Sequence, residues 1–322
     1  MTINRRDAMS GIQLIMLPSQ PPITWEKFCE IEDKFAIALD GYVIGGPRFD
    51  PVGMKASFNH HEGVDRLATR STCGQVLMAI RQGLFKSFRN EQGPYATVLA
   101  NDCDADVCTS WYVLKHHAVC EQAMNPLLNR LVMMEDCLDA TAGAYPFPAD
   151  LPVLRELAWV FEPYWQFRLS GQLDKKGTRA FEDVVENVEG RIGRHITGQG
   201  QSIPLDTRYE RIGGGKGWVM VKEIGAQSRT GMFADGIQAY VSVRELGLGR
   251  WAYVVGRMSN FILFDCQRIF DRCNAAEPAH ATVDDPIIPG DRWGGSDMIG
   301  GSPRIAASRI PPSVLEKIIE AT

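Results

Sequence analysis

Short apolar runs alternate with helix-like segments through the first 135 residues, and this alternation limits the fold more than any other feature of the chain. The runs "GYVIGG" (41–46) and "YATVLAND" (95–102) have the composition of buried strands. Segments 24–39 and 71–88 have apolar residues at helical spacing, and the second begins with a Ser/Thr cap. Strands that alternate with helices form a mostly parallel sheet flanked by helices. We therefore predict an α/β domain over residues 1–150.

The composition of the sequence changes in its second half. A Pro-rich break, "AGAYPFPADLP", separates two helix-like segments, 107–135 and 151–195. Beyond about residue 205, runs such as "GWVMVKEI" and "WAYVVGRMSNFILF" are rich in β-branched and aromatic residues and are separated by glycines. We predict a helical connector at 151–205 and a smaller α+β domain at 206–322. Segment 275–295 has no periodicity and is predicted to be a loop.

Bulk properties exclude several classes of protein. The formal charge of -5 argues against electrostatic binding of long nucleic acid, although a few local charges could bind a small anionic substrate. The eight cysteines contain no C-x-x-C pair, which disfavours structural zinc and suits reduced thiols in the cytoplasm. No segment has the roughly 18 apolar residues of a membrane helix, and "IQLIMLP" is too short for a signal peptide. We expect a cytoplasmic protein that does not act at a membrane.

Three aspartates follow the second predicted strand at every other position. Asp102, Asp104 and Asp106 lie in "VLANDCDADVCTSWYVLKHH", between an apolar run and a predicted helix. This places them at the carboxyl end of a parallel strand, where open α/β sheets bind ligands. A divalent cation such as Mn²⁺ or Mg²⁺ would make such crowded carboxylates tolerable. The alternative is a polar turn with a helix N-cap, and the stretch alone does not decide between them.

A pair of histidines, His60 and His61, lies in "FNHHEGVDRLATRST", again between a predicted strand and a predicted helix. In isolation, two adjacent histidines are more typical of a surface loop. Their position predicts the same edge of the sheet as the aspartates. Imidazole nitrogen together with carboxylate oxygen is a common ligand mix for a hydrolytic metal site.

With these motifs in place, the chain resembles the RecJ-type DHH phosphoesterases. "NDCDADVCTSWYVL" is similar to their D-x-D-x-D-G-x-x-S loop, and "FNHHEGV…STCGQV" is similar to their Asp-His-His motif with its Ser-Thr helix start. "LLNRLVMMEDCLDATAG" resembles a helical motif whose aspartate completes the metal site, which nominates Asp136 and, less strongly, Asp139. "IGGSPRIAASRIPPSVLEKIIEA" and "YVVGRMS" resemble segments of the DHH-associated substrate domain. The resemblance extends from about residue 40 to the C-terminus.

The chain departs from this family pattern in several places. Asn59 stands where the name-giving aspartate is expected, Val107 replaces a glycine, and Ser302 replaces a histidine. The His-His segment also precedes the aspartate loop, the reverse of the usual order. "GYVIGGPRFDPVGMKASFNHH" is similar to a V-D-x-G-G…F-D-H-H arrangement of a distant branch, with the aspartate of that motif missing.

The resemblance implies a hydrolase in which one or two Mn²⁺ ions activate water and stabilise phosphoryl oxygens. Its implied site comprises catalytic residues, metal ligands and substrate-binding residues. The implied catalytic residues are Asp104, Asp106, His60 and His61, and the implied ligands are His60, Asp102, Asp104, Asp106 and Asp136. The implied substrate-binding residues are Asn59, Arg257, Gly300, Gly301, Ser302 and Arg304. Two of these assignments have plain structural alternatives, because Arg257 would equally suit a surface ion pair and Gly300-Gly301 a turn.

Three functions stay open at this point. The first is an Mn²⁺-dependent phosphoesterase acting on a small phosphorylated molecule, a short oligonucleotide or a cyclic nucleotide. The second is a metal hydrolase of the same architecture that cleaves another bond, which Asn59 and Ser302 would permit. The third is a catalytically silent protein that binds a nucleotide. The oligomeric state is open, with a homodimer as one option.

Overall fold

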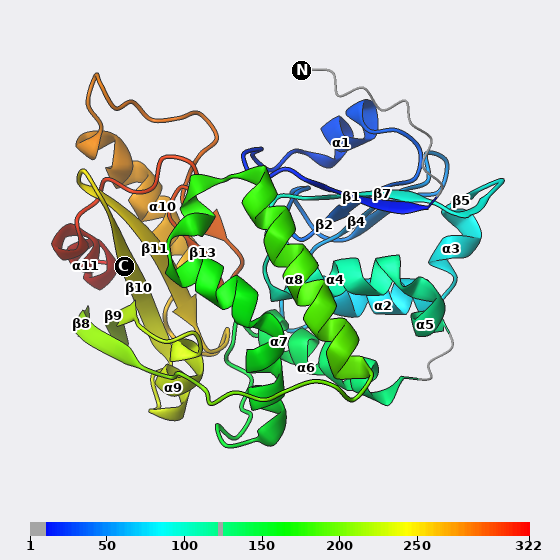
Figure 1. Ribbon diagram of the computed structural model, residues 1–322. Helices are drawn as coiled ribbons and strands as arrows, with labels where there is room; N and C mark the ends of the chain where they lie inside the picture. Colours follow the sequence, from blue (N-terminus) through cyan, green and yellow to red (C-terminus); the bar gives the residue numbers. More distant parts are fainter. Residues whose placement is uncertain (1–10, 122–124) are drawn as a thin grey trace.

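A mostly parallel sheet forms the first half of the molecule. The computed structural model describes residues 11–121 and 125–322, and Figure 1 shows this sheet well separated from a second one. The sheet has the order β1-β7-β2-β4-β3, in which neighbouring strands are parallel except for β3 at the edge. Its strands are β1 (Ile12–Met16), β2 (Ala36–Leu39), β3 (Arg48–Asp50), β4 (Lys55–Phe58) and β7 (Ala96–Ala100), and a separate short hairpin joins β5 (Arg89–Asn90) to β6 (Gly93–Pro94). The predicted mixed α/β character is thus confirmed.

Helices pack on this sheet and share its core. They are α1 (Trp25–Ile31), α2 (Thr72–Arg81), α3 (Leu84–Ser87), α4 (Ala105–Lys115), α5 (His117–Glu121), α6 (Pro126–Ala140), α7 (Pro152–Leu169), the short 3-10 helix η1 (Gln172–Lys175) and α8 (Thr178–Ile196). Val98 of β7, Val113 of α4 and Val160 of α7 are fully buried in one apolar cluster. Segment 151–196, predicted as a connector, is therefore helical and packs with the first sheet.

The beginning of the chain differs from the prediction in one consequential way. The helix predicted over 24–39 ends at Ile31, and its second half forms β2, while 41–46 forms no strand of its own. Phe35 adopts a positive φ of 72° between the two elements, which a continuous helix does not allow. A short apolar run such as "FAIAL" has no periodicity that separates a buried strand from a helix. The difference matters because it places the end of a strand at Leu39, directly before Asp40.

The second sheet is mixed and has its own core. Its order is β12-β13-β11-β10-β9-β8, with β9 and β10 parallel and the other neighbours antiparallel. The strands are β8 (Tyr209–Gly215), β9 (Trp218–Glu223), β10 (Ala239–Gly247), β11 (Arg250–Arg257), β12 (Gly294–Gly295) and β13 (Ile299–Gly301), and the helices are α9 (Ser228–Ala234), α10 (Cys266–Ala276), the 3-10 helix η2 (Glu277–His280) and α11 (Pro312–Glu320). Val241, Tyr253 and Leu315 are buried together in a cluster separate from that of the first sheet. The strand-rich reading of residues beyond 205 is confirmed, and the domain boundaries stay a prediction.

The predicted loop at 275–295 contains little regular structure. It includes the end of α10, the short η2 and β12.

In the described ranges, all eight cysteines are free thiols. None of the helices in these ranges combines the length and apolarity that crossing a membrane requires.

The C-terminal segment reaches across to the strand ends of the first sheet. Arg292 lies 3.0 Å from Glu62, and Arg304 lies 3.7 Å from Asp102. These contacts place the second sheet beside the loops that carry the predicted site.

Candidate metal site

Three adjacent strands bring acidic and imidazole side chains to one edge of the first sheet. Asp40 directly follows β2, His60 and His61 follow β4, and Asp102 begins the loop after β7. These strands are neighbours and run parallel in the order β7-β2-β4, so their carboxyl ends meet. Sequence analysis identified the two outer loops and missed Asp40, which lies between them. Asp40 has a φ of 50°, a left-handed conformation that aspartate tolerates better than most residues.

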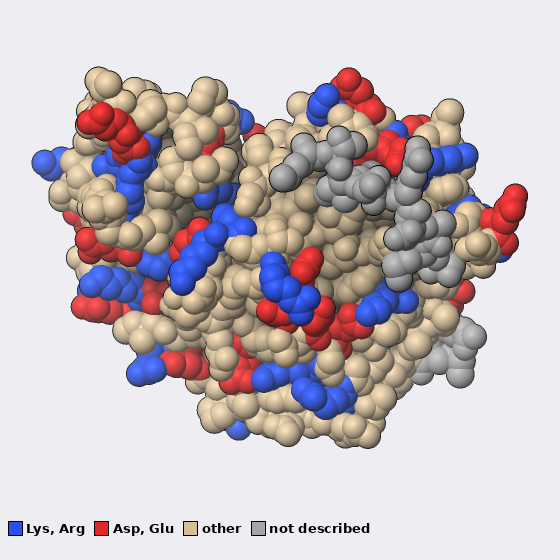
Figure 2. All heavy atoms as spheres, turned by 45° about the horizontal axis from the view of Figure 1, so that its top comes forward, with Lys and Arg blue, Asp and Glu red and all other residues tan. Residues whose placement is uncertain are grey.

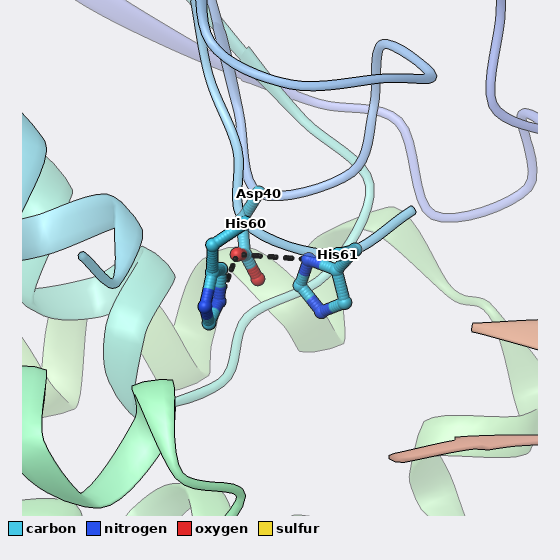
Figure 3. Close-up of side chains that lie close together, drawn as sticks. All are labelled: Asp40, His60 and His61. Atoms are coloured by element: carbon cyan, nitrogen blue, oxygen red, sulfur yellow. Dashed lines mark ion pairs between the residues drawn. The ribbon is translucent and has the colours of Figure 1, made fainter. Parts of the chain in front are cut away.

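Asp40 lies between the two histidines, as Figure 3 shows. Its Oδ1 is 3.4 Å from His60 Nε2 and 3.3 Å from His61 Nδ1, and it accepts a hydrogen bond of 2.9 Å from Thr72 Oγ1 at the start of α2. Burial of Asp40 would raise the pKa of its carboxyl group, but His61 and His60 outweigh burial and hold that pKa well below its usual range. Asp40 is therefore a buried carboxylate.

The Nε2 atom of His60 is the point on which the carboxylates converge. Asp139 Oδ2 of α6 lies 2.7 Å from it and Asp106 Oδ2 lies 3.5 Å from it, in addition to Asp40. Burial opposes protonation of His60, but Asp139 outweighs burial and helps raise the pKa of the ring to about 10. The carboxylates therefore favour a positive charge at Nε2.

The geometry at His60 also points to a missing partner. His60 Nε2 and Asp139 Oδ2 are both buried, and neither has a hydrogen bond of acceptable geometry. Buried polar atoms without partners are rare because each costs about 1–3 kcal/mol. Among the described residues, the possible ligand atoms of Asp40, His60 and His61, and those of His60, Asp106 and Asp139, lie within 4.8 Å of one another. These two groups could hold a metal ion.

A buried arginine, Arg66, fixes the other side of the His60 ring. Its guanidinium group lies 3.1 Å from His60 Nδ1 and donates to the carbonyl groups of Asp139 and Ala140 at the end of α6. Because a guanidinium group can only donate, this contact is a hydrogen bond only when Nδ1 carries no proton, as in a ring that binds a cation through Nε2. Nε2 is thus left as the ring atom that carries a proton, or that exchanges it for a cation. Arg66 also donates to Ser296 Oγ at 3.4 Å, which ties the site to the second sheet.

The three predicted aspartates have different surroundings. Both oxygens of Asp106 accept hydrogen bonds from the first amides of α2, 2.7 Å from Thr72 N and 2.6 Å from Cys73 N. Such amides and the helix dipole stabilise a carboxylate, yet burial raises the pKa of Asp106 to about 7, and Asp139 acts in the same direction. Asp104 caps α4 through a 2.9 Å bond from Val107 N. Burial, followed by the charge of Asp40, raises the pKa of Asp104 well above its usual range.

The structure therefore separates the members of the aspartate loop. Asp106 belongs to a possible ligand group, whereas Asp102 and Asp104 belong to neither. Asp102 accepts from Cys103 N at 2.8 Å and faces Arg304. The N-cap alternative is thus confirmed for Asp104, and Asp106 is the member of this stretch that could help to hold a metal ion.

Asp136 has a different role from the one implied by the resemblance. Its oxygens accept hydrogen bonds of 2.7 Å from Ser71 N and from Arg70, at the start of α2. The two helices approach so closely here that a Cβ on Gly74 would lie 2.7 Å from Asp136 Oδ1. Asp139, three residues further along α6, takes the place beside His60 instead. Residues three apart lie on one face of a helix, so the sequence alone did not separate them.

We predict that Asp136→Asn destabilises the protein by about 1–3 kcal/mol, because the amide oxygen can accept only one of the two hydrogen bonds and the amide nitrogen then faces the other donor. Metal affinity should stay unchanged. Denaturant unfolding and isothermal titration with Mn²⁺ check both statements. Asp139→Asn is the matched control and should do the reverse, with loss of metal binding and little loss of stability.

Asn59 is a buried structural residue rather than an exposed substrate contact. Its amide nitrogen donates to Val43 O at 3.0 Å and to Gly45 O at 2.7 Å. Its amide oxygen accepts from His61 N at 3.0 Å and lies 3.1 Å from His61 Nδ1. Asn59 therefore orients His61, and the other ring nitrogen of His61 is left available. Burial lowers the pKa of His61 to about 4, so the ring is neutral at pH 7.

Most of the residues that were predicted to bind substrate in the second sheet form hydrogen bonds or close contacts that stabilise the fold. Arg257 donates to the carbonyl groups of Asp297 and Ile262 and to Asn260 Oδ1, at 2.9–3.1 Å. Ser302 exchanges hydrogen bonds with the backbone of Tyr253.

The two predicted glycines lie where strands pack too closely for a side chain. A Cβ on Gly300 would be 2.3 Å from Gly294 O, and one on Gly301 would be 2.4 Å from Tyr253 O. Arg304 is the exception among the predicted substrate residues, since its half-exposed guanidinium group faces the aspartate loop.

Comparisons of the chain with protein-family models, with curated proteins and with solved structures found no match.

Proposed function

We propose that this protein is a metal-dependent phosphoesterase that hydrolyses a small phosphorylated substrate at the edge of the first sheet. The observation that carries the proposal is the convergence of Asp40, Asp106 and Asp139 on the buried Nε2 atom of His60, at distances of 2.7–3.5 Å and without a hydrogen bond of acceptable geometry. Mixed imidazole and carboxylate ligands suit Mn²⁺, Fe²⁺ and Zn²⁺. Of these we favour Mn²⁺, in line with the resemblance to the DHH phosphoesterases.

The residues of the candidate site would have different roles. A bound divalent cation lowers the pKa of water and stabilises charge on phosphoryl oxygens. Asp40, His60, Asp106 and Asp139 would hold this cation, while Arg66 and the α2 amides hold His60 and Asp106 in place. His61 is neutral at pH 7 and partly exposed, with its Nδ1 directed at Asn59 and Asp40. Its Nε2 can therefore accept a proton or complete the metal site.

The charge distribution favours a small substrate over a long polyanion. Figure 2 shows acidic and basic side chains interspersed over one face of the molecule, without a broad basic stripe. Long nucleic acids are held mainly by clustered Lys and Arg along such a stripe. Arg304, which faces Asp102 from the second sheet, supplies a local positive charge near the site.

We expect purified protein to hydrolyse bis(p-nitrophenyl) phosphate in the presence of Mn²⁺ and to lose this activity in EDTA. His60→Gln should lower the rate by more than about 100-fold, because loss of a group that only orients a ligand already costs 10- to 100-fold. His116→Gln, which alters a histidine paired with Glu189 away from the site, is the control and should keep full activity.

Two other results would redirect the proposal. Tight Mn²⁺ binding without turnover of any phosphoester would favour a metal hydrolase for another bond, or a protein that binds a nucleotide without cleaving it. Activity that is unaffected by both EDTA and His60→Gln would exclude the site described above.

A further inference from the structure

The histidine loop, residues 59–66, is held by the second sheet as well as by the first. Glu62 of this loop pairs with Arg292 at 3.0 Å. Arg66, at the end of the loop, donates to Ser296 Oγ at 3.4 Å. Both partners flank β12 of the second sheet. The position of the histidine loop therefore depends on how the second sheet is docked.

Arg66 uses each nitrogen of its guanidinium group for a different part of the site. Nη2 lies 3.1 Å from His60 Nδ1 and donates to Asp139 O. Nε donates to Ala140 O at 2.9 Å, and Nη1 is the atom that donates to Ser296 Oγ. Because Arg66 is only 4% exposed, water does not readily replace a lost partner. One buried side chain thus fixes His60 relative to the end of α6 and ties both to the second sheet.

Ser296 is a fixed point of the second sheet. It is 1% exposed, and its hydroxyl oxygen accepts from Met298 N at 3.3 Å and from Ile299 N at 3.1 Å. Gln267 of α10 donates to the carbonyl groups of Gly295 and Ser296, at 3.0 and 2.8 Å. A change in the docking of the second sheet would therefore displace this hydroxyl group.

A cation on His60 favours the same arrangement of these groups. When a cation occupies Nε2, Nδ1 carries no proton and can accept from Arg66. Hydrogen bonds of this kind orient a metal-binding imidazole ring, and their loss costs about 10- to 100-fold in metal affinity. The docked second sheet and a bound cation therefore stabilise the same placement of Arg66.

We propose that Arg66 and Ser296 are positioning residues that couple docking of the second sheet to metal binding. Ser296 belongs to neither group of possible ligands among the described residues, so it acts through Arg66. Coupling between two equilibria is reciprocal, so a bound cation also stabilises the docked second sheet. The inference rests on the metal site of the proposed function, and it is independent of the bond that is cleaved.

Calorimetric titration of the full chain with Mn²⁺ measures this coupling. Ser296→Ala should weaken Mn²⁺ binding about tenfold or more, although it removes no ligand. Arg66→Lys keeps the charge, but one ammonium group does not reproduce the fork, and Mn²⁺ binding should weaken by about 10- to 100-fold. Ser296→Thr keeps the hydroxyl group and should bind Mn²⁺ nearly as well as the wild type does.

Ser308→Ala is the matched control for the titration. Ser308 is also fully buried beside the second sheet, and its hydroxyl oxygen accepts from the amide of Ile310, two residues further on, as that of Ser296 does from Met298. Its hydroxyl group donates to Glu277 within the same part of the chain. Ser308→Ala should therefore bind Mn²⁺ as the wild type does.

Amide hydrogen exchange separates coupling from local damage to the turn. In the wild type, Mn²⁺ should slow exchange of the Met298 and Ile299 amides about fivefold or more, the lower end of typical coupling between sites. Arg66→Lys leaves the turn itself unaltered, yet saturating Mn²⁺ should no longer slow this exchange. A purely local role of the turn would give exchange that does not depend on Mn²⁺ in either protein.

Several results would overturn the coupling. They are unchanged Mn²⁺ affinity in folded Ser296→Ala, an equal loss of affinity in Ser308→Ala, and exchange of the turn that does not respond to Mn²⁺ in the wild type. If Ser296→Ala does not fold, unchanged affinity in Arg66→Lys overturns it instead. A wild-type protein that binds no Mn²⁺ would remove the metal site and the coupling together. Coupled Mn²⁺ binding without hydrolysis of any phosphoester would contradict the proposed function alone.

Discussion

Asp40→Asn is expected to abolish tight Mn²⁺ binding and to destabilise the metal-free protein at pH 7 by only about 1–3 kcal/mol, because the two histidines favour the charged form of Asp40 in the folded state. Asp40 contacts both histidines of the candidate site, and asparagine removes its negative charge without changing its size. Metal affinity should fall by more than about 100-fold, since loss of a mere orienting group costs 10- to 100-fold. Isothermal titration with Mn²⁺ measures this effect.

The stability of Asp40→Asn distinguishes loss of a ligand from loss of the fold. The low pKa of Asp40 means that the folded protein favours its charge, but the same charge raises the pKa values of Asp104 and Asp106, so its removal also relieves repulsion and the variant should remain folded. Thr72 Oγ1 can still donate to the asparagine oxygen. Asp284→Asn, at an exposed position, is the control for metal binding. Unchanged Mn²⁺ affinity in Asp40→Asn would remove the central residue from the proposed site.

Asn59→Asp is expected to destabilise the protein by about 3 kcal/mol or more and to leave Mn²⁺ affinity no tighter. The amide nitrogen of Asn59 donates to two carbonyl oxygens, Val43 O and Gly45 O, in a fully buried position. A carboxylate would lose both hydrogen bonds and would face those oxygens with a negative charge, at about 1–3 kcal/mol for each unsatisfied group. Denaturant unfolding and Mn²⁺ titration measure the two effects.

This prediction tests how the asparagine at position 59 should be understood. If Asn59 were a degraded metal ligand, restoring aspartate would tighten metal binding. If the structure is right, Asp40 already supplies the carboxylate and Asn59 is required as a donor. Asn187→Asp, on the exposed face of α8, is the matched control and should change neither property. Tighter Mn²⁺ binding by Asn59→Asp would contradict this assignment.

Local sequence patterns predicted one strand of the first sheet, β7, and part of the site. The apolar run before Asp102 forms β7, and His60 and His61 follow β4, as the position of the loops required. Parallel strands of one sheet present their carboxyl ends on the same edge whatever their order along the chain. The reversed order of the two motifs therefore did not prevent them from meeting.

Other features were not predicted from the sequence, for identifiable reasons. Asp40 was overlooked because the short run before it was assigned to a helix. Its signal was nonetheless present, as an aspartate followed by glycine at the end of "FAIALDG". Arg66 gave no signal at all, because its importance comes from acceptors distant in the chain, Ala140 and Ser296.

The sequence by itself determined which chain segments become buried strands and helices across most of the molecule, and which loops could carry a cation site. These properties depend on residue type and on spacing along the chain. Only the tertiary structure decided between Asp136 and Asp139, since both lie on one face of α6 and differ in what packs against them. It also decided that Arg257 donates to a backbone carbonyl group while Arg304 faces the aspartate loop. The physical reason is that a buried side chain takes its role from the charges and hydrogen-bonding groups around it, and here those come from residues distant in the sequence.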